Sequence, residues 1–295
     1  MTNVVEALAA SAGAVNEVLD SLLSPERGPE RRLLEAMRYS TLGSGKRIRP
    51  FLVHACSRLF EVPDSRALRA AAAIEMVHCY SLIHDDLPAM DDDDLRRGQP
   101  TCHVKFDEAT AILAGDALLT MAFEVLADPA THADPHVRCD LVTALAKAAG
   151  PRGMVGGQML DLVAENHTLD MPEVARLQRL KTGQLIGFSC EAGAILGKAS
   201  EESRHALRNY AHDLGLAFQI ADDLLDVEGD AAEVGKKTGK DAAAGKATFV
   251  SLLGVERARA QAQAIAEQAA SHLDSFDAKA GVLRQLAQFV VERRA

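Results

Sequence analysis

Two stretches, YSLIHDD at residues 80–86 and AFQIADD at residues 217–223, each run an apolar helical pattern into a pair of aspartates. A further aspartate follows each pair, at Asp91 and at Asp226. Apolar residues at helical spacing cover most of the remaining chain, and no alternating strand pattern with hairpin turns interrupts them. We therefore predict an all-α fold, a single large helix bundle with mostly short connections.

The expected helices share an apolar period of about 3.6 residues. They cover residues 2–23, 29–41, 49–60, 65–87, 106–126, 136–148, 153–165, 171–196, 201–226 and 247–292. Asp170, followed by Pro172 and Glu173, has the pattern of an N-cap with a capping box. No Pro/Ser/Gly linker divides the chain, so we expect one domain over residues 1–295.

Composition supports helices and limits the class of partner. Hydrophobic residues make up 48% of the 295 residues, aromatics only 4%, and Trp is absent. No uninterrupted apolar run approaches the roughly 18 residues of a membrane span, and the N-terminus lacks the basic start of a signal peptide. The net charge of -10 argues against nucleic acid or an anionic membrane surface as a partner.

The five cysteines are odd in number, irregular in spacing and without a CxxC pair. This pattern indicates neither a disulfide framework nor a zinc site, and it favours reduced thiols. We therefore expect a cytoplasmic protein with no membrane span and no nucleic-acid partner.

The second aspartate cluster is Asp222, Asp223 and Asp226 in FQIADDLLD. Positions four apart on an α-helix differ by about 40° around the axis, so Asp222 and Asp226 share one face. Carboxylates placed in this way repel one another unless a cation lies between them, and oxygen ligands on an open helix face suit Mg²⁺. A solvated acidic face near a helix end is the alternative.

The first cluster is Asp85, Asp86 and Asp91 in HDDLPAMDDDD. In an unbroken helix Asp85 and Asp91 would lie about 120° apart, too far round to share an ion. Pro88 cannot donate to the carbonyl of His84 and should end the helix, which lets Asp91 turn back toward Asp85. An acidic loop is the alternative, but it does not explain the two arginines that follow at once.

Basic residues recur at several expected helix ends, where they could hold anions. These are Lys46, Arg47 and Arg49 in GSGKRIRP, Arg96 and Arg97, Lys181 in LKTGQ, and Lys236, Lys237, Lys240 and Lys246 in GKKTGKDAAAGKAT. Some polar residues lie in apolar helical stretches, where a satisfied hydrogen bond in the core is the ordinary explanation. They are His78, Asp116, Gln158 and Gln219.

Together these segments carry a resemblance. The chain resembles short-chain trans-prenyl diphosphate synthases of the isoprenoid synthase fold, and most closely bacterial farnesyl diphosphate synthases. The matching segments are GSGKRIRP (43–50), SLIHDDLPAMDDDDLRRG (81–98), AGDALL (114–119), GGQMLDL (156–162), LKTGQLI (180–186), FQIADDLLD (218–226) and GKAT (245–248). The long first motif followed by a second DDxxD is highly specific.

The resemblance implies a bundle around a central cavity, a homodimer, and roles for individual residues. Mg²⁺, three ions with substrate bound, would be held by Asp85, Asp86, Asp91, Asp222, Asp223 and Asp226. The allylic diphosphate would be bound by Arg96, Lys181, Thr182, Gln219, Lys246 and either Lys236 or Lys237. Isopentenyl diphosphate would be bound by Lys46, Arg49, His78 and Arg97. The carboxylates Asp85, Asp86, Asp91, Asp222 and Asp223, with Lys181, would be the catalytic set, and Gln158 would line the cavity.

Product length is expected to depend on Tyr80 and Ser81, which precede Asp85 by five and four residues. At about 1.5 Å per residue they lie about 6–8 Å down the helix axis, where a bulky Tyr80 could form a floor. Tyr80 could instead simply pack in the core. In enzymes of this kind an aromatic residue here, with the Leu-Pro insertion in the first motif, goes with a C15 product. A geranyl or geranylgeranyl product is the alternative.

Three other classes fit the sequence less well. An HD-type phosphohydrolase, suggested by His84 and Asp85, would leave the second motif and the basic loops unused. A terpene cyclase would normally replace the second DDxxD with an Asn/Ser/Glu motif. A silent partner subunit would not need intact acids and lysines in both motifs.

Overall fold

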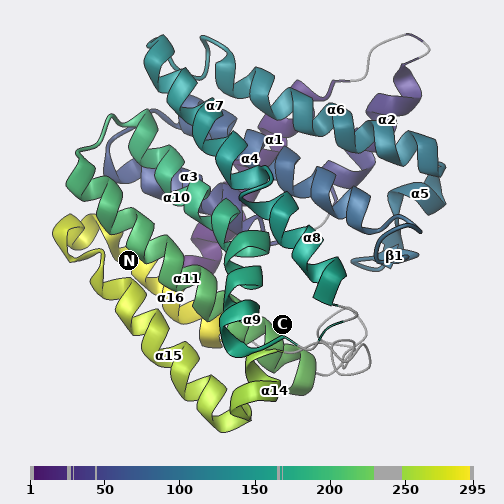
Figure 1. Cartoon of the computed structure of the whole chain (residues 1–295). Helices are drawn as coiled ribbons and strands as arrows, with labels where there is room; N and C mark the ends of the chain where they lie inside the picture. Colours follow the sequence, from purple (N-terminus) through teal and green to yellow (C-terminus); the bar gives the residue numbers. More distant parts are fainter. Residues whose placement is uncertain are drawn as a thin grey trace.

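The computed structural model describes residues 3–24, 28, 30–43, 45–164, 167, 169–228 and 248–292. Figure 1 shows these residues folded almost entirely into helices that pack around one another. The expected all-α class is confirmed, because the described chain contains a single two-stranded sheet of four residues.

The helices of the first half lead to the first carboxylate cluster and then around the core. They are α1 (Val4–Leu22), α2 (Arg31–Thr41), α3 (Ile48–Leu59), α4 (Asp64–Asp85), the short α5 (Cys102–Lys105), α6 (Glu108–Ala127), α7 (Pro135–Ala149) and α8 (Met154–Ala164). The second half contains α9 (Met171–Gln178), the π-helical segment η1 (Arg179–Gly183), α10 (Gln184–Leu196), α11 (Glu201–Glu228), α14 (Phe249–Leu253), α15 (Val255–Ser271), the 3₁₀ segment η2 (Asp274–Ala280) and α16 (Gly281–Glu292).

Side-chain caps fix where several helices begin. Asp107 accepts a hydrogen bond from the backbone of Thr110 at the start of α6, and Asp134 caps α7 ahead of Pro135. The predicted capping box of Asp170 and Glu173 is present at the start of α9. Each cap satisfies backbone N–H groups that the first helical turn leaves without a partner.

Helix α4 forms the centre of the bundle and packs along α6, α3 and α1. Residues 70–74 of α4 are buried on every side, which is typical of a core helix. Helix α6 is long and apolar enough to cross a membrane by length and composition alone, although it lies along α4. Packing against α4 accounts for the apolar face that α6 turns inward.

The structure corrects three expectations about secondary structure. The single helix expected over 247–292 is wrong, because Gly254 adopts φ 80° between α14 and α15 and η2 separates α15 from α16. The expectation of no hairpin is also wrong. Strands β1 (Leu95–Arg96) and β2 (Gln99–Pro100) pair around Arg97 and Gly98, which both have positive φ, as a two-residue hairpin loop requires. These strands are too short to show alternation. The expected helix over 171–196 is interrupted by the wider turn of η1.

An ion pair in the interior joins the start of α3 to the middle of α4. Arg47, whose φ of 50° is left-handed, places Nη1 2.5 Å from Oε1 of Glu75, and both side chains are at most 2% exposed. The same guanidinium donates to the carbonyls of Thr41 and Gly43 and to Asn16 of α1. Arg47 therefore ties the loop before α3 to α4 and α1, a structural role that the sequence did not separate from those of Lys46 and Arg49.

We predict that Glu75→Ala lowers the free energy of unfolding by about 3–5 kcal/mol, since it leaves the Arg47 charge buried without its partner. Urea unfolding followed by circular dichroism measures the change. Glu35→Ala is the matched control, because its pair with Arg31 is exposed and should contribute no more than about 0.5 kcal/mol. Equal effects of the two substitutions would contradict this assignment.

Candidate active site

The first carboxylate cluster lies at the C-terminal end of α4, where the helix ends at Asp85. The chain then folds back, and the amide of Asp91 donates to the carbonyl of Asp85 over 2.8 Å. The amide of Asp92 likewise donates to the carbonyl of Leu87 over 3.2 Å. The predicted return of Asp91 toward Asp85 after Pro88 is confirmed.

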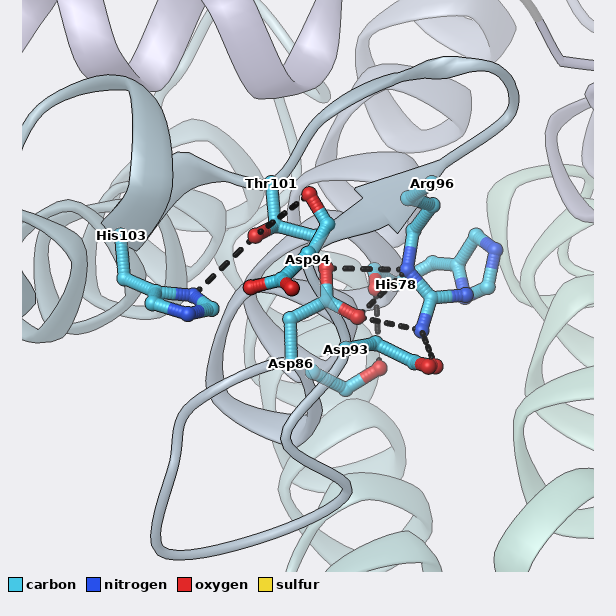
Figure 2. A network of polar contacts seen from close by, with 8 residues as sticks. His78, Asp86, Asp93, Asp94, Arg96, Thr101 and His103 are labelled. Atoms are coloured by element: carbon cyan, nitrogen blue, oxygen red, sulfur yellow. Dashed lines mark hydrogen bonds and ion pairs between the residues drawn. The ribbon is translucent and has the colours of Figure 1, made fainter.

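Arg96 of the hairpin binds the second aspartate of this cluster. Its Nε lies 2.7 and 2.9 Å from the two oxygens of Asp86, which is 3% exposed, and Figure 2 shows the guanidinium reaching across to that carboxylate. Burial raises the pKa of Asp86, and the hydrogen bonds from Arg96 act in the opposite direction. Asp86 is therefore locked to the hairpin, and this bond orients Arg96 beside Asp85 and Asp91.

Asp85 lies among charges contributed by three different elements. Burial raises the pKa of its carboxyl to about 6, Lys181 of η1 lowers it, and neighbouring Asp91 raises it again. Lys181 in turn forms an ion pair of 2.5 Å with Asp161 of α8. The end of α4 therefore faces η1 and α8 across the site.

Close backbone contact between α8 and η1 explains the second glycine of GGQMLDL. A Cβ on Gly157 would lie 2.2 Å from the backbone nitrogen of Lys181, so a larger residue would push the two segments apart. The amide oxygen and nitrogen of Gln158, the next residue, are both buried without a hydrogen-bond partner. Such a group is costly unless another molecule satisfies it, which makes it a candidate contact for a bound ligand.

The second carboxylate cluster lies near the C-terminal end of α11, and its members have different surroundings. Asp223 is 6% exposed and accepts a hydrogen bond of 2.8 Å from the amide of Phe249, at the start of α14. Burial lowers the pKa of the Arg49 guanidinium, and nearby Asp222 acts in the opposite direction. Asp226 lies one turn further along α11 and is partly exposed. Asp223 therefore holds α14, whereas Asp222 lies near a basic residue of the site.

Basic side chains from α3 and the hairpin surround His78 of α4. Burial lowers the pKa of His78 well below its ordinary value, and Arg49, Arg97, Arg96 and Arg47 lower it further. His78 is consequently neutral at physiological pH and can serve as a hydrogen-bond donor or acceptor. Arg96 lies near Asp85 and Arg49 lies near Asp222, so the two aspartate clusters border the same basic group.

The remaining predicted residues occupy different positions around this group. Tyr80 is 6% exposed and meets the ring of His84 edge to face at 5.7 Å, and the Ser81 hydroxyl donates to the carbonyl of His78 over 2.8 Å. Gln219 is 9% exposed, Thr182 is half-buried on η1 and Lys46 is exposed. Lys236, Lys237, Lys240 and Lys246 lie outside the described residues.

The donor atoms suit Mg²⁺ bound jointly with a phosphate ligand. Within the described ranges, no three His, Cys, Asp or Glu side chains are grouped so that they could hold a metal by themselves. Mg²⁺ usually takes only one or two carboxylates from the protein and completes its shell with water and substrate phosphates. The half-buried carboxylate of Asp85, with its pKa raised to about 6, fits that chemistry, because a bound cation would favour its charged form.

Comparison with known proteins decides the family. A profile of the family described as polyprenyl synthetase matches residues 30–286. The chain belongs to this family. It is 45% identical to the farnesyl diphosphate synthase of Escherichia coli K12, over 97% of each chain. It is also 43% identical to the chloroplastic geranylfarnesyl diphosphate synthase of Leucosceptrum canum, over 95% of this chain and 78% of that one.

A solved relative shares the same fold. The crystal structure of an FPP/GFPP synthase from Zymomonas mobilis, determined in its apo form, superposes with a TM-score of 0.89. It is 50% identical in sequence, over 96% of this chain and 97% of that chain. The predicted isoprenoid synthase fold and the resemblance to trans-prenyl diphosphate synthases are confirmed. His84, which suggested an HD-type phosphohydrolase, instead makes a hydrogen bond of 3.0 Å with the carbonyl of Ile112 on α6.

Two contacts within the site were missed by sequence reasoning. Asp161 was not identified as the partner of Lys181, and Asp223 was not recognised as the acceptor for α14. The spacing of Gln158 and Asp161 by three residues, on one face of α8, was a usable signal for the first. No comparable local signal exists for the second, since Asp223 and Phe249 are distant in the chain.

Proposed function

We propose that this protein is a farnesyl diphosphate synthase, which joins isopentenyl diphosphate head to tail with dimethylallyl diphosphate and then with geranyl diphosphate. One observation carries the proposal: carboxylates at the ends of α4 and α11 border a single group of arginines and a lysine. That arrangement suits two diphosphate esters bound side by side, one of them through divalent ions. The near full-length similarity to farnesyl diphosphate synthases supports this choice of substrates.

The metal ligands proposed are Asp85, Asp86, Asp91, Asp222, Asp223 and Asp226, for three Mg²⁺ ions when substrate is bound. Asp86 and Asp223 already have protein partners, Arg96 and the amide of Phe249, so their main contribution is to orient the neighbouring carboxylates. Bound Mg²⁺ would supply positive charge to the departing diphosphate. Asp85 lies beside Lys181 and Asp222 lies near Arg49, so both carboxylates border the basic group.

The basic residues divide between the two substrates. Arg96, Lys181, Thr182 and Gln219, together with Lys246 and either Lys236 or Lys237, would bind the allylic diphosphate. Lys46, Arg49, His78 and Arg97 would bind isopentenyl diphosphate. The ion pair with Asp161 supports the first assignment, because it holds the ammonium of Lys181 close to Asp85 before substrate arrives. The neutral ring of His78 supports the second, because it adds a hydrogen bond without further charge among the arginines.

The charges of these residues account for the steps of the proposed reaction. As the allylic C–O bond breaks, negative charge grows on the diphosphate, and Lys181 and Arg96 are already oriented to stabilise it. The double bond of isopentenyl diphosphate, held nearby by Arg49 and Arg97, attacks the allylic carbocation and forms the new C–C bond. Loss of a proton, which we assign to the departing diphosphate as base, gives a trans product that is one isoprene unit longer.

We further propose a cytoplasmic homodimer. The exposed side chains of Ile112 and Leu113 on α6, 43% and 57% exposed, would be covered by a second copy of the chain. A geranylgeranyl product is the second candidate function, because chloroplastic geranylgeranyl diphosphate synthases are up to 45% identical to this chain. Tyr80 favours the shorter product: its ring is buried just over one turn before Asp85, below the proposed metals.

Incubation with isopentenyl and dimethylallyl diphosphates should release inorganic diphosphate only when both substrates and Mg²⁺ are present, and should yield a C15 product by mass. Asp222→Asn should lower kcat at least about 100-fold, because charge stabilisation in the transition state is lost. Asp94→Asn, in the exposed acidic stretch after the first motif, is the matched control and should retain activity. Diphosphate release without isopentenyl diphosphate would contradict condensation and favour a hydrolase or a cyclase.

Tyr80→Ala should shift the main product from C15 to C20 or longer, since removing the ring opens space in the direction of the growing chain. Mass spectrometry of the dephosphorylated prenols measures the shift. Tyr210→Phe serves as the control, because Tyr210 is buried elsewhere, with its hydroxyl bonded to Leu283. An unchanged C15 product from Tyr80→Ala would remove Tyr80 as a determinant of chain length.

A further inference from the structure

The hairpin formed by β1 and β2 carries two basic residues with separate proposed roles, Arg96 and Arg97. Arg96 is fixed by Asp86 of α4, which binds its guanidinium with both carboxylate oxygens. Arg97 lies one residue further on, in the two-residue turn, and has a φ of 53°. The position of Arg97 therefore depends on what holds the rest of the hairpin.

Close packing does not fix the inner side of this hairpin. A cavity of about 70 Å³ lies between the hairpin, α2 and α4. Its lining includes both arginines of the hairpin and, from α2, Tyr39. A segment that borders such a space makes fewer van der Waals contacts than one in a filled core. Specific bonds from a neighbouring element must therefore supply part of the positioning.

Tyr39, in the last turn of α2, supplies one such bond. Its hydroxyl donates to the carbonyl of Pro100 over 2.7 Å. Pro100 is the β2 residue that pairs with Leu95 of β1, at the base of the hairpin. Burial, and then nearby Cys102, raise the pKa of the Tyr39 hydroxyl, so it keeps its proton and remains a donor.

Ring contacts fix the direction in which this hydroxyl points. The Tyr39 ring meets Phe106 edge to face at 5.8 Å, and Nζ of Lys105 lies 5.9 Å from the centre of the Tyr39 ring. Both of these residues follow β2 in the chain. Figure 1 shows α2 beside α5, with β1 close by at the same edge of the molecule. Tyr39 therefore contacts the chain after the hairpin turn at three points.

The same helix leads into the other basic segment of the site. Helix α2 ends at Thr41, and the chain reaches Lys46 five residues later. Gly45 lies against the guanidinium of Arg97, because a Cβ on this glycine would be 2.5 Å from Nη1. The loop before α3 and the hairpin thus meet at Gly45. Tyr39 joins α2 to the hairpin a second time, through β2.

We propose that Tyr39 is a positioning residue for the binding of isopentenyl diphosphate. By holding Pro100, it keeps the hairpin in place so that Arg97 lies beside the loop before α3. Tyr39 itself does not touch the substrate. The choice of isopentenyl diphosphate rests on the proposed function, whereas the contact between Tyr39 and the hairpin does not depend on it.

This role is selective for one of the two substrates. Asp86 holds Arg96 on α4 independently of Tyr39, so a loosened hairpin would displace Arg97 more than Arg96. Arg96 is assigned to the allylic diphosphate and Arg97 to isopentenyl diphosphate. Loss of the Tyr39 hydroxyl should therefore weaken the binding of isopentenyl diphosphate and leave the binding of the allylic substrate unchanged.

Tyr39→Phe removes the hydroxyl and keeps the ring. Its KM for isopentenyl diphosphate should rise about three- to tenfold, the range expected for loss of one neutral hydrogen bond. Its kcat and its KM for geranyl diphosphate should stay unchanged. Steady-state assays of the full chain with Mg²⁺ measure these constants. Loss of a residue that only stabilised the fold would lower the amount of active enzyme, and hence kcat, without changing one KM alone.

Tyr210→Phe is the matched control, because the hydroxyl of Tyr210 also donates to a backbone carbonyl, that of Leu283, over 2.9 Å. It should leave both KM values unchanged. Arg97→Gln is the positive control. It should raise the KM for isopentenyl diphosphate at least about tenfold, since a charge-assisted contact with the diphosphate is lost.

Hydrogen exchange followed by mass spectrometry tests the contact without turnover. Peptides that span residues 94–101 should exchange faster in Tyr39→Phe than in wild-type protein. The amide of Thr101, which donates to the carbonyl of Asp94 over 2.9 Å across the base of the hairpin, should lose protection. The same peptides should be unchanged in Tyr210→Phe.

Three results for Tyr39→Phe would overturn the proposal: an unchanged KM for isopentenyl diphosphate, an equal rise in both KM values, or hairpin exchange equal to that of wild-type protein. Failure of the proposed function would be seen separately, as the absence of a C15 product from isopentenyl and dimethylallyl diphosphates in wild-type protein. The exchange measurement would still decide whether Tyr39 holds the hairpin.

Discussion

The buried ion pair between Arg47 and Glu75 fixes the positions from which the proposed substrate site is built. Glu75 lies ten residues before Asp85 on α4, about 15 Å along the helix axis. Arg47 lies between Lys46 and Arg49, and it also binds the carbonyls of the loop before α3. One pair with almost no solvent contact therefore sets the register between the basic start of α3 and the acidic end of α4. Removing either partner would leave a buried charge, which explains why the two elements keep this register.

Around this ion pair, charges of like sign lie closer together than they would in an unfolded chain. Burial and then four arginines lower the pKa of His78, and burial with neighbouring Asp91 raises that of Asp85. Such an arrangement costs free energy in the absence of ligand. A diphosphate offsets the cost on the basic side and divalent ions offset it on the acidic side. A site that binds an anion together with divalent metal ions has these properties.

As a consequence, the aspartates within each motif have different roles. Asp86 binds Arg96 in two places and Asp223 receives the amide of Phe249, so each motif uses one carboxylate to hold the protein together. Asp85 lies beside Lys181, and Asp222 lies near Arg49. Likewise Asp161 holds Lys181 in position from α8. Orientation before binding is what lets charged groups stabilise a departing diphosphate without first reorganising.

Local signals in the sequence predicted much of this arrangement. Contacts between segments that are distant in the chain could not be predicted from the sequence. Pro88 predicted that α4 would end and that Asp91 would turn back, because a proline removes one specific hydrogen bond. Asp170 and Glu173 predicted the start of α9 for a similarly local reason. The break at Gly254 and the hairpin at Gly98 were missed, since apolar periodicity does not report a single left-handed residue. The partners of Asp161 and Asp223 depend on how α8 meets η1 and how α11 meets α14, which no single segment encodes.

The central claim is that the ends of α4 and α11 face one diphosphate. A crystal structure with Mg²⁺, isopentenyl diphosphate and a thio analogue of dimethylallyl diphosphate would test it most directly. Our account predicts that the analogue's diphosphate lies between Asp85 and Asp222, joined to both through metal ions, with Lys181 beside it. A diphosphate bound elsewhere, or a complex in which either aspartate points away from it, would contradict the account.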